Sequence, residues 1–301
     1  MKRVSIITVN YNQPGATQEL LDSILLCNTY PLLEVIVVDN GSKENKVHDW
    51  RNQYPAFNFI RSEKNLGFAG GNNLGISQST GDYLFLINND TVITDGLIEK
   101  LATFLDVNAD YAMVSPKIHY YEPNTMMQYA GFTKMNFYTA RNSCISQFET
   151  DSGQYDHLDK LTYYAHGAAM MLRKNLVDKI GLMPEEYFLY YEEMDWCEMF
   201  KRAGYKIGLC IDALIYHKES LATGKNSPLK AYYMSRNRLL FVRRNATKMQ
   251  KIIFFFYYAI FAHVGYIISC IKNRQLGQIP IFSKAILWNL THKVQESNTV
   301  N

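Results

Sequence analysis

The chain has 301 residues, of which 48% are hydrophobic and 20% charged, and it contains 22 Tyr and 16 Phe. This composition excludes a disordered protein outside the polar tail after Val294, and the length predicts one large domain with a modest appendage. The start of the chain has no signal-peptide core, and the five cysteines include no C-x-x-C pair, so neither export nor a zinc site is indicated. We therefore expect a protein of the reducing cytoplasm.

Positive charge is concentrated in the last quarter of the chain. Residues 223–301 contain twelve Lys and Arg and one Glu, a net charge of +11, whereas residues 1–222 have a net charge of −8. The basic residues flank apolar runs and do not accompany a nucleic-acid-binding motif. This distribution favours an anionic membrane surface as a partner and argues against nucleic acid.

The first half of the chain alternates β-rich runs with helical stretches. Strands are predicted at residues 4–9, 33–38, 57–61, 83–87 and 111–114, and a helix is predicted over residues 16–26, where leucine and isoleucine recur at helical spacing. This order predicts an α/β fold with a mostly parallel sheet flanked by helices. Ligands of such sheets bind at the carboxyl ends of the strands, so the residues after each strand form the candidate site.

Polar residues follow the first two predicted strands. Asn10-Tyr11-Asn12 comes after the first, and Asp39-Asn40-Gly41-Ser42 comes after the second. Asn-Gly is typical of a hairpin turn, but residues 43–49 offer no return strand. A carboxylate there can accept a hydrogen bond from a pyrimidine N–H or a ribose hydroxyl, so a turn and a nucleotide contact both remain open. The candidate nucleotide contacts are Thr8, Asn10, Asn12 and Asp39.

A glycine-rich segment, residues 65–75, follows the third strand. It lacks the Lys of a Walker loop, and a dinucleotide fingerprint would follow the first strand instead. Its glycines would let the backbone approach a ligand, and Asn72 or Asn73 could cap the next helix, whose N-terminus favours an anion. The candidate nucleotide contacts here are Asn65, Gly67, Gly71 and Asn72.

The fourth strand ends in Asn88-Asn89-Asp90-Thr91. Mg²⁺ and Mn²⁺ prefer oxygen ligands, and one carboxylate is enough when substrate phosphates and water complete the shell. The alternative is a turn in which Asp90 or Thr91 caps the following helix. Asn89 is therefore a candidate nucleotide contact and Asp90 a candidate metal ligand.

Residues 116–160 show no steady periodicity, so we expect them to form an irregular excursion around the site. A second ordered block covers residues 163–217. Glu192, Glu193 and Asp195 open a predicted helix in this block that ends before Gly204. Three carboxylates at a helix start often serve only the helix dipole. Their aromatic neighbours indicate a partly closed pocket, however, where a carboxylate can act as a general base.

Two further residues have both a structural and a functional interpretation. His217 ends an apolar run, where a lone His is commonly structural but could also join a metal site. Arg236 lies among hydroxyl groups and is suited to bind a diphosphate, whereas plain membrane-surface basicity is the alternative.

In chain order the motifs read VNYN, VVDNGS, NLGFAGGNN, LINNDT, HGAAMMLR, FLYYEEMDWC, YH and SRN. Over residues 4–238 this set resembles the inverting family 2 glycosyltransferases of GT-A fold, particularly the bacterial rhamnosyltransferase-like branch. Two departures are visible. The usual Asp-x-Asp metal motif is Asn88-Asn89-Asp90, and Glu193 stands where relatives usually have Asp.

The resemblance implies a nucleotide-sugar donor, a dTDP- or UDP-sugar, and a divalent metal, Mg²⁺ or Mn²⁺. By the same resemblance Asp39 contacts the pyrimidine, Asn65 and Gly71 line the nucleotide pocket, Asp90 holds the metal with His217, and Glu193 is the base of an inverting displacement. The acceptor would be a glycan or a polyprenyl-diphosphate-linked glycan in cell-surface polysaccharide assembly, with dTDP-rhamnose as the expected donor. The rivals are a nucleotidyltransferase, which would need a basic glycine-rich loop at residues 10–13, and a non-catalytic membrane-bound glycan-binding module.

The apolar run at residues 252–271 has no formally charged side chain and is flanked by basic residues. It is long enough to span a bilayer, but positive charge on both sides gives no clear orientation. We expect helices that lie in the membrane interface, aided by residues 279–290 with Trp288, in preference to a span or a homodimer contact. The sequence thus predicts a catalytic domain at 1–240 and a membrane-associating segment at 241–301, on the cytoplasmic inner face of the cell membrane.

Overall fold

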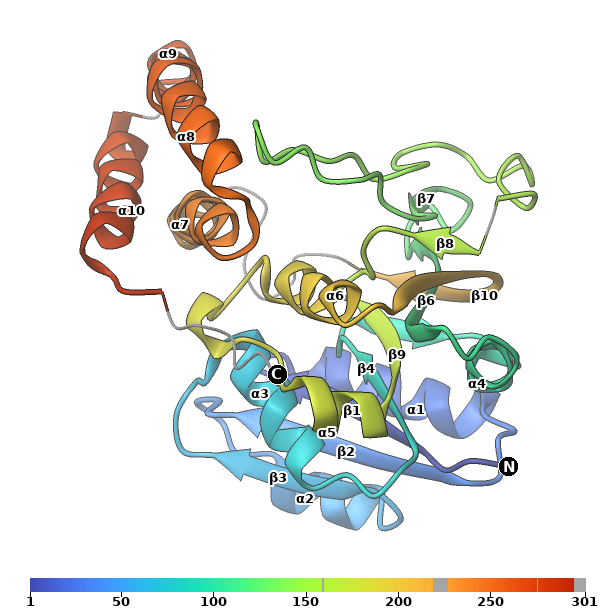
Figure 1. Ribbon diagram of the computed structural model, residues 1–301. Helices are drawn as coiled ribbons and strands as arrows, with labels where there is room; N and C mark the ends of the chain where they lie inside the picture. Colours follow the sequence, from blue (N-terminus) through green and yellow to red (C-terminus); the bar gives the residue numbers. More distant parts are fainter. Residues whose placement is uncertain (159, 219–226, 275, 295–301) are drawn as a thin grey trace.

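A computed structural model of the protein describes residues 1–158, 160–218, 227–274 and 276–294. Its centre is a sheet in the order β3-β2-β1-β4-β9-β6-β10-β5, with β7 paired to β6 and β8 to β10 (Figure 1). The strands are β1 (Val4–Asn10), β2 (Leu33–Asn40), β3 (Asn58–Ser62), β4 (Tyr83–Ile87), β5 (Thr91–Ile93), β6 (Tyr111–Tyr120), β7 (Met127–Tyr129), β8 (Leu161–Thr162), β9 (Ala169–Arg173) and β10 (Lys206–His217). The predicted α/β fold is confirmed.

The sheet is mixed, and its N-terminal half is parallel. Strands β3, β2, β1 and β4 run in one direction, whereas β9 is antiparallel to both β4 and β6. The carboxyl ends of β1, β2 and β4 therefore meet at one edge of the parallel half. This edge is where the polar residues singled out in the sequence come together.

Helices cover both faces of the sheet (Figure 1). One face packs against α1 (Pro14–Cys27), α2 (Val47–Gln53) and α4 (Leu97–Val107), and the other against α3 (Gly67–Ser77), α5 (Lys174–Ile180) and α6 (Glu192–Arg202). Side chains alternate along a strand, so the neighbours Ile6 and Ile7 of β1 are both fully buried, one in each layer. Burial on both faces explains why β1 and β4 read as nearly continuous apolar runs.

The glycine-rich segment forms α3 itself, so the prediction that Asn72 or Asn73 caps the following helix is wrong. Both asparagines lie inside α3, which begins at Gly67. A Cβ added to Gly71 would lie 2.8 Å from Val9 Cγ1, and one added to Gly75 would clash with Ile7. These glycines allow α3 to pack closely on β1, because anything larger would push the helix off the sheet.

The excursion after the fifth predicted strand starts later than expected. Strand β6 continues to Tyr120 and pairs with β10, and β7 adds a short strand on its other side. The stretch from residue 130 to 158 is irregular and is held by scattered backbone hydrogen bonds and isolated bridges.

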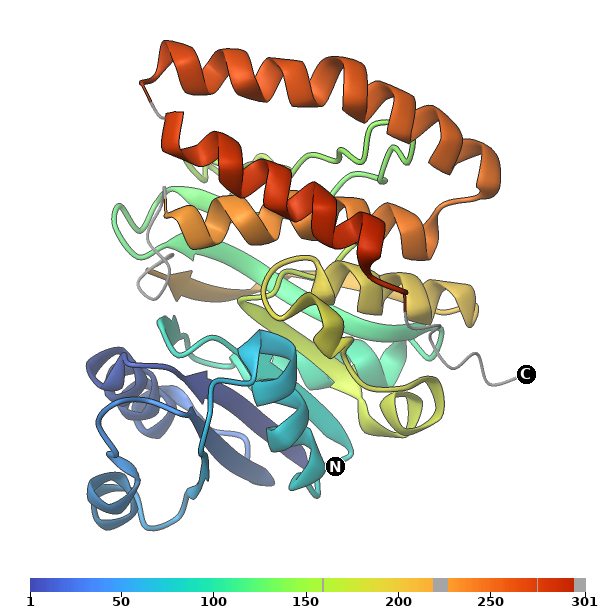
Figure 2. The ribbon, with the colours of Figure 1, turned by 90° about the vertical axis from the view of Figure 1, so that its left-hand side faces the viewer.

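The C-terminal part is helical: α7 (Pro228–Asn245), α8 (Lys248–Tyr257), a π-helical turn η2 (Tyr258–Ala262), α9 (His263–Lys272) and α10 (Ile279–Thr291). Helices α8 and α9 run on through η2 as one helix, Lys248–Lys272, long and apolar enough to cross a membrane by length and composition. Figure 2 shows this helix at the outer edge, with α7 and α10 between it and the sheet. The domain boundary predicted at residue 240 falls within α7.

Candidate active site

A buried hydrogen-bond network joins the ends of β1 and β2. Asn10 Nδ2 donates to Asp39 Oδ1 and to Ser42 Oγ, both at 3.0 Å, and Asn10 Oδ1 accepts from Thr17. Asp39 is fully buried, and its second oxygen is paired with Arg61. The network fixes the two loops relative to each other, and a pyrimidine that contacts Asp39 must share or displace Arg61.

The remaining polar candidates at this edge also have protein partners, apart from Thr8, whose buried hydroxyl has no hydrogen-bond partner among the described residues. Asn12 Oδ1 accepts from Lys43 N, Asn65 Oδ1 from Gly67 N, Asn72 Nδ2 donates to Phe68 O, and Asn89 Nδ2 donates to Thr17 Oγ1. The structure thus gives Asn65 and Asn89 positions at the edge, where they hold the loops. Asn72 and Gly71 lie buried in α3, against the rest of the protein.

Gly67 has a specific backbone role at the start of α3. Its φ is +76°, and an added Cβ would clash with the carbonyl of Phe188, which accepts a hydrogen bond from Phe68 N at 2.7 Å. This glycine therefore lets the start of α3 lie close to the segment before α6. That contact couples α3 to the acidic cluster.

Asp90 and His217 meet although they are far apart in the sequence. His217 Nδ1 lies 2.7 Å from Gln128 Oε1, so this nitrogen carries the proton and donates. The other nitrogen, Nε2, lies 3.1 Å from Asp90 Oδ1, within ion-pair distance, yet it is buried and makes no hydrogen bond. An imidazole nitrogen and a carboxylate oxygen that face each other at this distance fit a pair of ligands for one cation.

The donor set at this position is small. Among the described residues, no group of three or more His, Cys, Asp or Glu is placed to hold a metal. Asp90 and His217 would therefore hold a divalent ion together with phosphate oxygens and water, which is common for Mg²⁺. Thr91 Oγ1 donates to Asn88 O, and α4 begins only at Leu97, so the alternative that Asp90 or Thr91 caps that helix is wrong.

His166 is a site residue that sequence reasoning missed. Its ring centroid lies 6.2 Å from that of His217, and its Nδ1 accepts from Ala168 N at 3.1 Å. Burial and the neighbouring His217 lower its pKa to about 3, so the ring is neutral with its proton on Nε2. The signal available in the sequence was a His-Gly pair directly before strand β9.

Glu193 lies in the first turn of α6, beside Gly167. A Cβ added to Gly167 would lie 3.7 Å from Glu193 Cγ, so His166 and Gly167 together connect Glu193 to the Asp90–His217 pair. Burial raises the pKa of the Glu193 carboxyl to about 7, against the opposing effect of backbone N–H groups at the helix start. A carboxyl group that titrates near neutral pH is suited to take a proton from a hydroxyl.

The other two carboxylates of the cluster differ from Glu193 in their surroundings. Burial and the adjacent Glu193 raise the pKa of Glu192 well above its ordinary value, which favours the uncharged form of this side chain. Asp195 is fully buried, with one oxygen 2.5 Å from Arg244 Nε and the other 2.5 Å from Asn245 Nδ2. These contacts give Asp195 the role of joining α6 to α7.

The segment before α6 is conformationally strained. Phe188, Tyr190 and Tyr191 all have positive φ, at 63°, 70° and 75°. Asn237 of α7 holds this segment, because its side-chain amide donates to the carbonyls of Tyr187, Leu189 and Tyr190. Strain that persists under several constraints is typical of functional segments, and here it sets the position of Glu193.

Arg236 has other partners than the diphosphate predicted for it. It is 6% exposed, its Nη2 donates to the carbonyls of Glu186 and Tyr187, and it stacks on Trp288 at 4.3 Å. The guanidinium thus shares with Asn237 the task of holding the segment before α6. The contact of Arg236 with a diphosphate stays a prediction.

The comparison with known proteins places the chain in a family. Residues 5–181 match the profile of the family described as Glycosyl transferase family 2. The low-salt glycan biosynthesis hexosyltransferase Agl10 of Haloferax volcanii is 29% identical over 79% of this chain and 74% of its own length. The dTDP-rhamnosyl transferase RfbF of Shigella flexneri is 24% identical over 70% of this chain and 71% of its own.

A solved structure shows the same fold. The mannosyltransferase PcManGT from Pyrobaculum calidifontis, in complex with GDP-Man and Mn²⁺, superimposes with a TM-score of 0.59 at 15% identity, over 97% of this chain and 76% of that one. The fold of this chain is therefore GT-A-like. The chain belongs to glycosyltransferase family 2, and it is an enzyme that transfers a sugar from a nucleotide-sugar donor.

Proposed function

We propose that the enzyme transfers a sugar with inversion at the anomeric carbon, and that Glu193 is the base. The preferred candidate donor is dTDP-rhamnose, and the acceptor is a glycan or a polyprenyl-diphosphate-linked glycan. The observation that supports this most strongly is the Glu193 carboxyl, with a pKa raised to about 7, beside Gly167. The dTDP-rhamnosyl transferase among the relatives supports the choice of donor. UDP-sugars are the next candidates.

The chain's own residues account for the chemistry. Asp39 receives the pyrimidine at the end of β2, and the Asp90 end of β4 receives the diphosphate. Glu193 removes the proton of the acceptor hydroxyl as that oxygen attacks the anomeric carbon from the face opposite the leaving nucleoside diphosphate. One displacement of this kind inverts the configuration.

A divalent ion fits the residues present. The buried Nε2 of His217 makes no hydrogen bond and faces Asp90, so these two side chains would hold the ion. When bound, it would neutralise charge on the diphosphate. The mannosyltransferase whose fold this chain shares is complexed with Mn²⁺, which supports the same choice here. Neutral His166 would orient a donor hydroxyl or phosphate oxygen from its Nε2–H.

The C-terminal helices would place the enzyme on the inner face of the cell membrane. Of the most apolar window of the helix Lys248–Lys272, 11% is buried, and Phe256 and Phe261 are 67% and 65% exposed. An apolar surface of this kind needs a cover, and the basic residues around it match an anionic lipid surface. A homodimer through the same surface is the alternative cover.

The test is the anomeric configuration of the product. The enzyme is incubated with Mn²⁺, a glycan acceptor and a panel of dTDP-, UDP- and GDP-sugars, and the new linkage is assigned by NMR. We expect one dTDP- or UDP-sugar to react with inversion. A product of retained configuration would overturn the proposed mechanism, and a strict preference for a GDP-sugar would overturn the proposed donor.

A further inference from the structure

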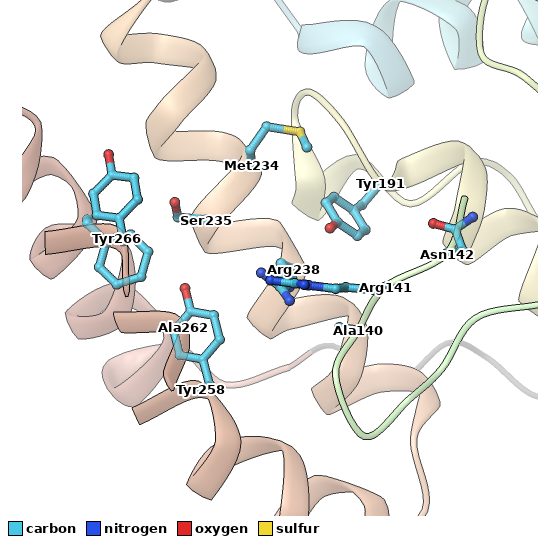
Figure 3. A pocket seen from close by; sticks show the side chains of 11 residues that line it. Ala140, Arg141, Asn142, Tyr191, Met234, Ser235, Arg238, Tyr258, Ala262 and Tyr266 are labelled. Atoms are coloured by element: carbon cyan, nitrogen blue, oxygen red, sulfur yellow. The ribbon is translucent and has the colours of Figure 1, made fainter. Parts of the chain in front are cut away.

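A cavity of about 390 Å³ lies between the catalytic domain and the apolar helix Lys248–Lys272. Its walls come from the loop at residues 140–142, from the segment before α6, from α7, and from the long apolar helix with α10. Figure 3 shows Arg141 of the loop and Arg238 of α7 reaching into the same space between Tyr191 and Tyr258. Among the residues whose placement the structure gives, no Asp or Glu lines this cavity.

The polar groups that line the cavity are mainly donors without acceptors. Arg238 Nε, Asn142 Nδ2 and the Tyr258 hydroxyl are buried and make no hydrogen bond among the described residues. Arg141 is exposed, and its side chain forms no ion pair with any described residue. Buried donors without partners are costly, and several of them around two guanidinium groups match an oxyanion. Phosphate and diphosphate groups are the common biological oxyanions of this size.

The cavity also borders the surface that would face lipid. Tyr258, Ala262 and Tyr266 line it at spacings of four residues, so they form one face of the apolar helix. The other face of the same helix carries exposed apolar side chains, among them Phe256, Ile260 and Val264. A ligand with an anionic head and an apolar tail could therefore place the head in the cavity and leave the tail along the helix.

Tyr191 connects this cavity to the catalytic carboxylate. It lines the cavity, and it is the residue directly before α6, two positions before Glu193. Burial raises the pKa of its hydroxyl to about 12, while Arg238 lowers this pKa and Glu193 raises it further. The cavity and the base are therefore linked through one strained residue. A sugar attached to a head group in the cavity would lie in the direction of Glu193.

We propose that Arg141 and Arg238 form a binding site for the phosphate or diphosphate head of an isoprenoid lipid whose apolar chain lies along the helix Lys248–Lys272. This deepens the proposed function, since it gives the lipid-linked acceptor a site of its own. A free phosphate shares the head-group chemistry but offers nothing to the apolar face.

The first experiment measures binding by calorimetry on the full chain, with EDTA present so that no metal recruits diphosphate at Asp90. The probes are farnesyl diphosphate, inorganic pyrophosphate and farnesol. We expect farnesyl diphosphate to bind at least about 10-fold more tightly than either part alone, and Arg141→Ala or Arg238→Gln to weaken it about 10-fold. Arg141→Lys should restore part of the loss. The matched control Lys272→Ala removes a charge from the same helix outside the cavity and should change nothing.

Two results would overturn the site. One is unchanged farnesyl diphosphate affinity in both arginine variants, and the other is equally tight binding of pyrophosphate or farnesol, which would indicate a free-anion site or a plain apolar groove. Arg238 donates to the Thr139 carbonyl, so its variant can perturb folding. The Arg141 side chain makes no hydrogen bond within the described ranges, and its variant keeps the test decisive.

A kinetic arm separates this site from the proposed function. For a lipid-linked acceptor, Arg141→Ala should raise KM about 10-fold with little change in kcat, while hydrolysis of the sugar donor stays normal. An unchanged KM would overturn the site and leave the proposed function standing. If no donor is turned over but farnesyl diphosphate binding still depends on Arg141, the proposed function fails and the site stands.

Discussion

Replacing Glu193 by Gln should abolish most activity and at the same time stabilise the folded enzyme. The variant keeps the shape of the side chain but cannot accept a proton, so kcat with a saturating acceptor should fall about 10²-fold or more. Burial raises the pKa of this carboxyl from 4.5 to about 7. The charged form therefore costs the folded state up to about 3 kcal/mol, less where solvent screens the exposed side of the group.

The raised pKa of Glu193 determines how the stability of the folded protein depends on pH. A carboxyl group whose pKa is higher in the folded than in the unfolded state makes the protein lose stability as pH rises from 4.5 to about 7. Glu193→Gln should thus unfold at a higher urea concentration than the wild type at pH 8 and at about the same concentration at pH 4.5. The wild-type kcat should rise through pH 7, because only the carboxylate can act as the base.

The loss of turnover is measured by nucleoside diphosphate release, and the gain in stability is measured by urea unfolding. The control is Glu198→Gln, one turn further along α6. The Glu198 carboxylate accepts hydrogen bonds from Tyr164 and Lys201, and the enzyme should tolerate this change. Near-normal turnover of Glu193→Gln, or a wild-type rate that does not change between pH 6 and 8, would refute the assignment of the base.

Four other changes test the remaining assignments. Glu192→Gln should keep turnover within about threefold in the release assay, because burial and the adjacent Glu193 raise the pKa of Glu192 and so favour its uncharged form; inactivity of this variant would move the base to Glu192. Asp195→Asn should lower the free energy of unfolding by about 3 kcal/mol through the loss of its pair with Arg244; a stability equal to the wild type would contradict the structural role. Asp90→Asn or His217→Gln should weaken Mn²⁺-dependent dTDP binding at least about 10-fold in calorimetry and leave metal-free binding unchanged, whereas equal losses with and without Mn²⁺ would speak against a metal site. Phe256→Glu with Phe261→Glu should reduce co-sedimentation with anionic liposomes and leave dTDP affinity intact, and undiminished co-sedimentation would favour a homodimer interface.

The sequence was most informative about secondary structure and about the polar residues that directly follow each strand. The five predicted strands and the first helix exist, and their polar ends gather at one edge because parallel strands place their carboxyl ends together. The pairing of Asp90 with His217 followed from the resemblance, since periodicity alone cannot bring together residues so far apart in the sequence. The structure then supplied the distance of 3.1 Å.

Sequence reasoning was incomplete where the reason for a residue lies across a packing contact. Gly71 was predicted to line the nucleotide pocket, and the structure adds that the side chains of Val9 and Asn40 lie next to it. Arg236 was predicted to bind a diphosphate, and the structure adds that the carbonyls of Glu186 and Tyr187 accept its hydrogen bonds. The cavity around Arg141 was also invisible, because its walls come from segments about one hundred residues apart.

The most direct test of the account follows both products of one reaction. The enzyme, Mn²⁺, a nucleotide sugar and a polyprenyl-diphosphate-linked glycan are combined, and mass spectrometry records the nucleotide released and the mass of the acceptor. The account predicts release of a nucleoside diphosphate and a matching gain of one sugar residue by the acceptor, both lost in Glu193→Gln. Release of pyrophosphate or of a nucleoside monophosphate, or an acceptor that gains mass equally in Glu193→Gln, would contradict it.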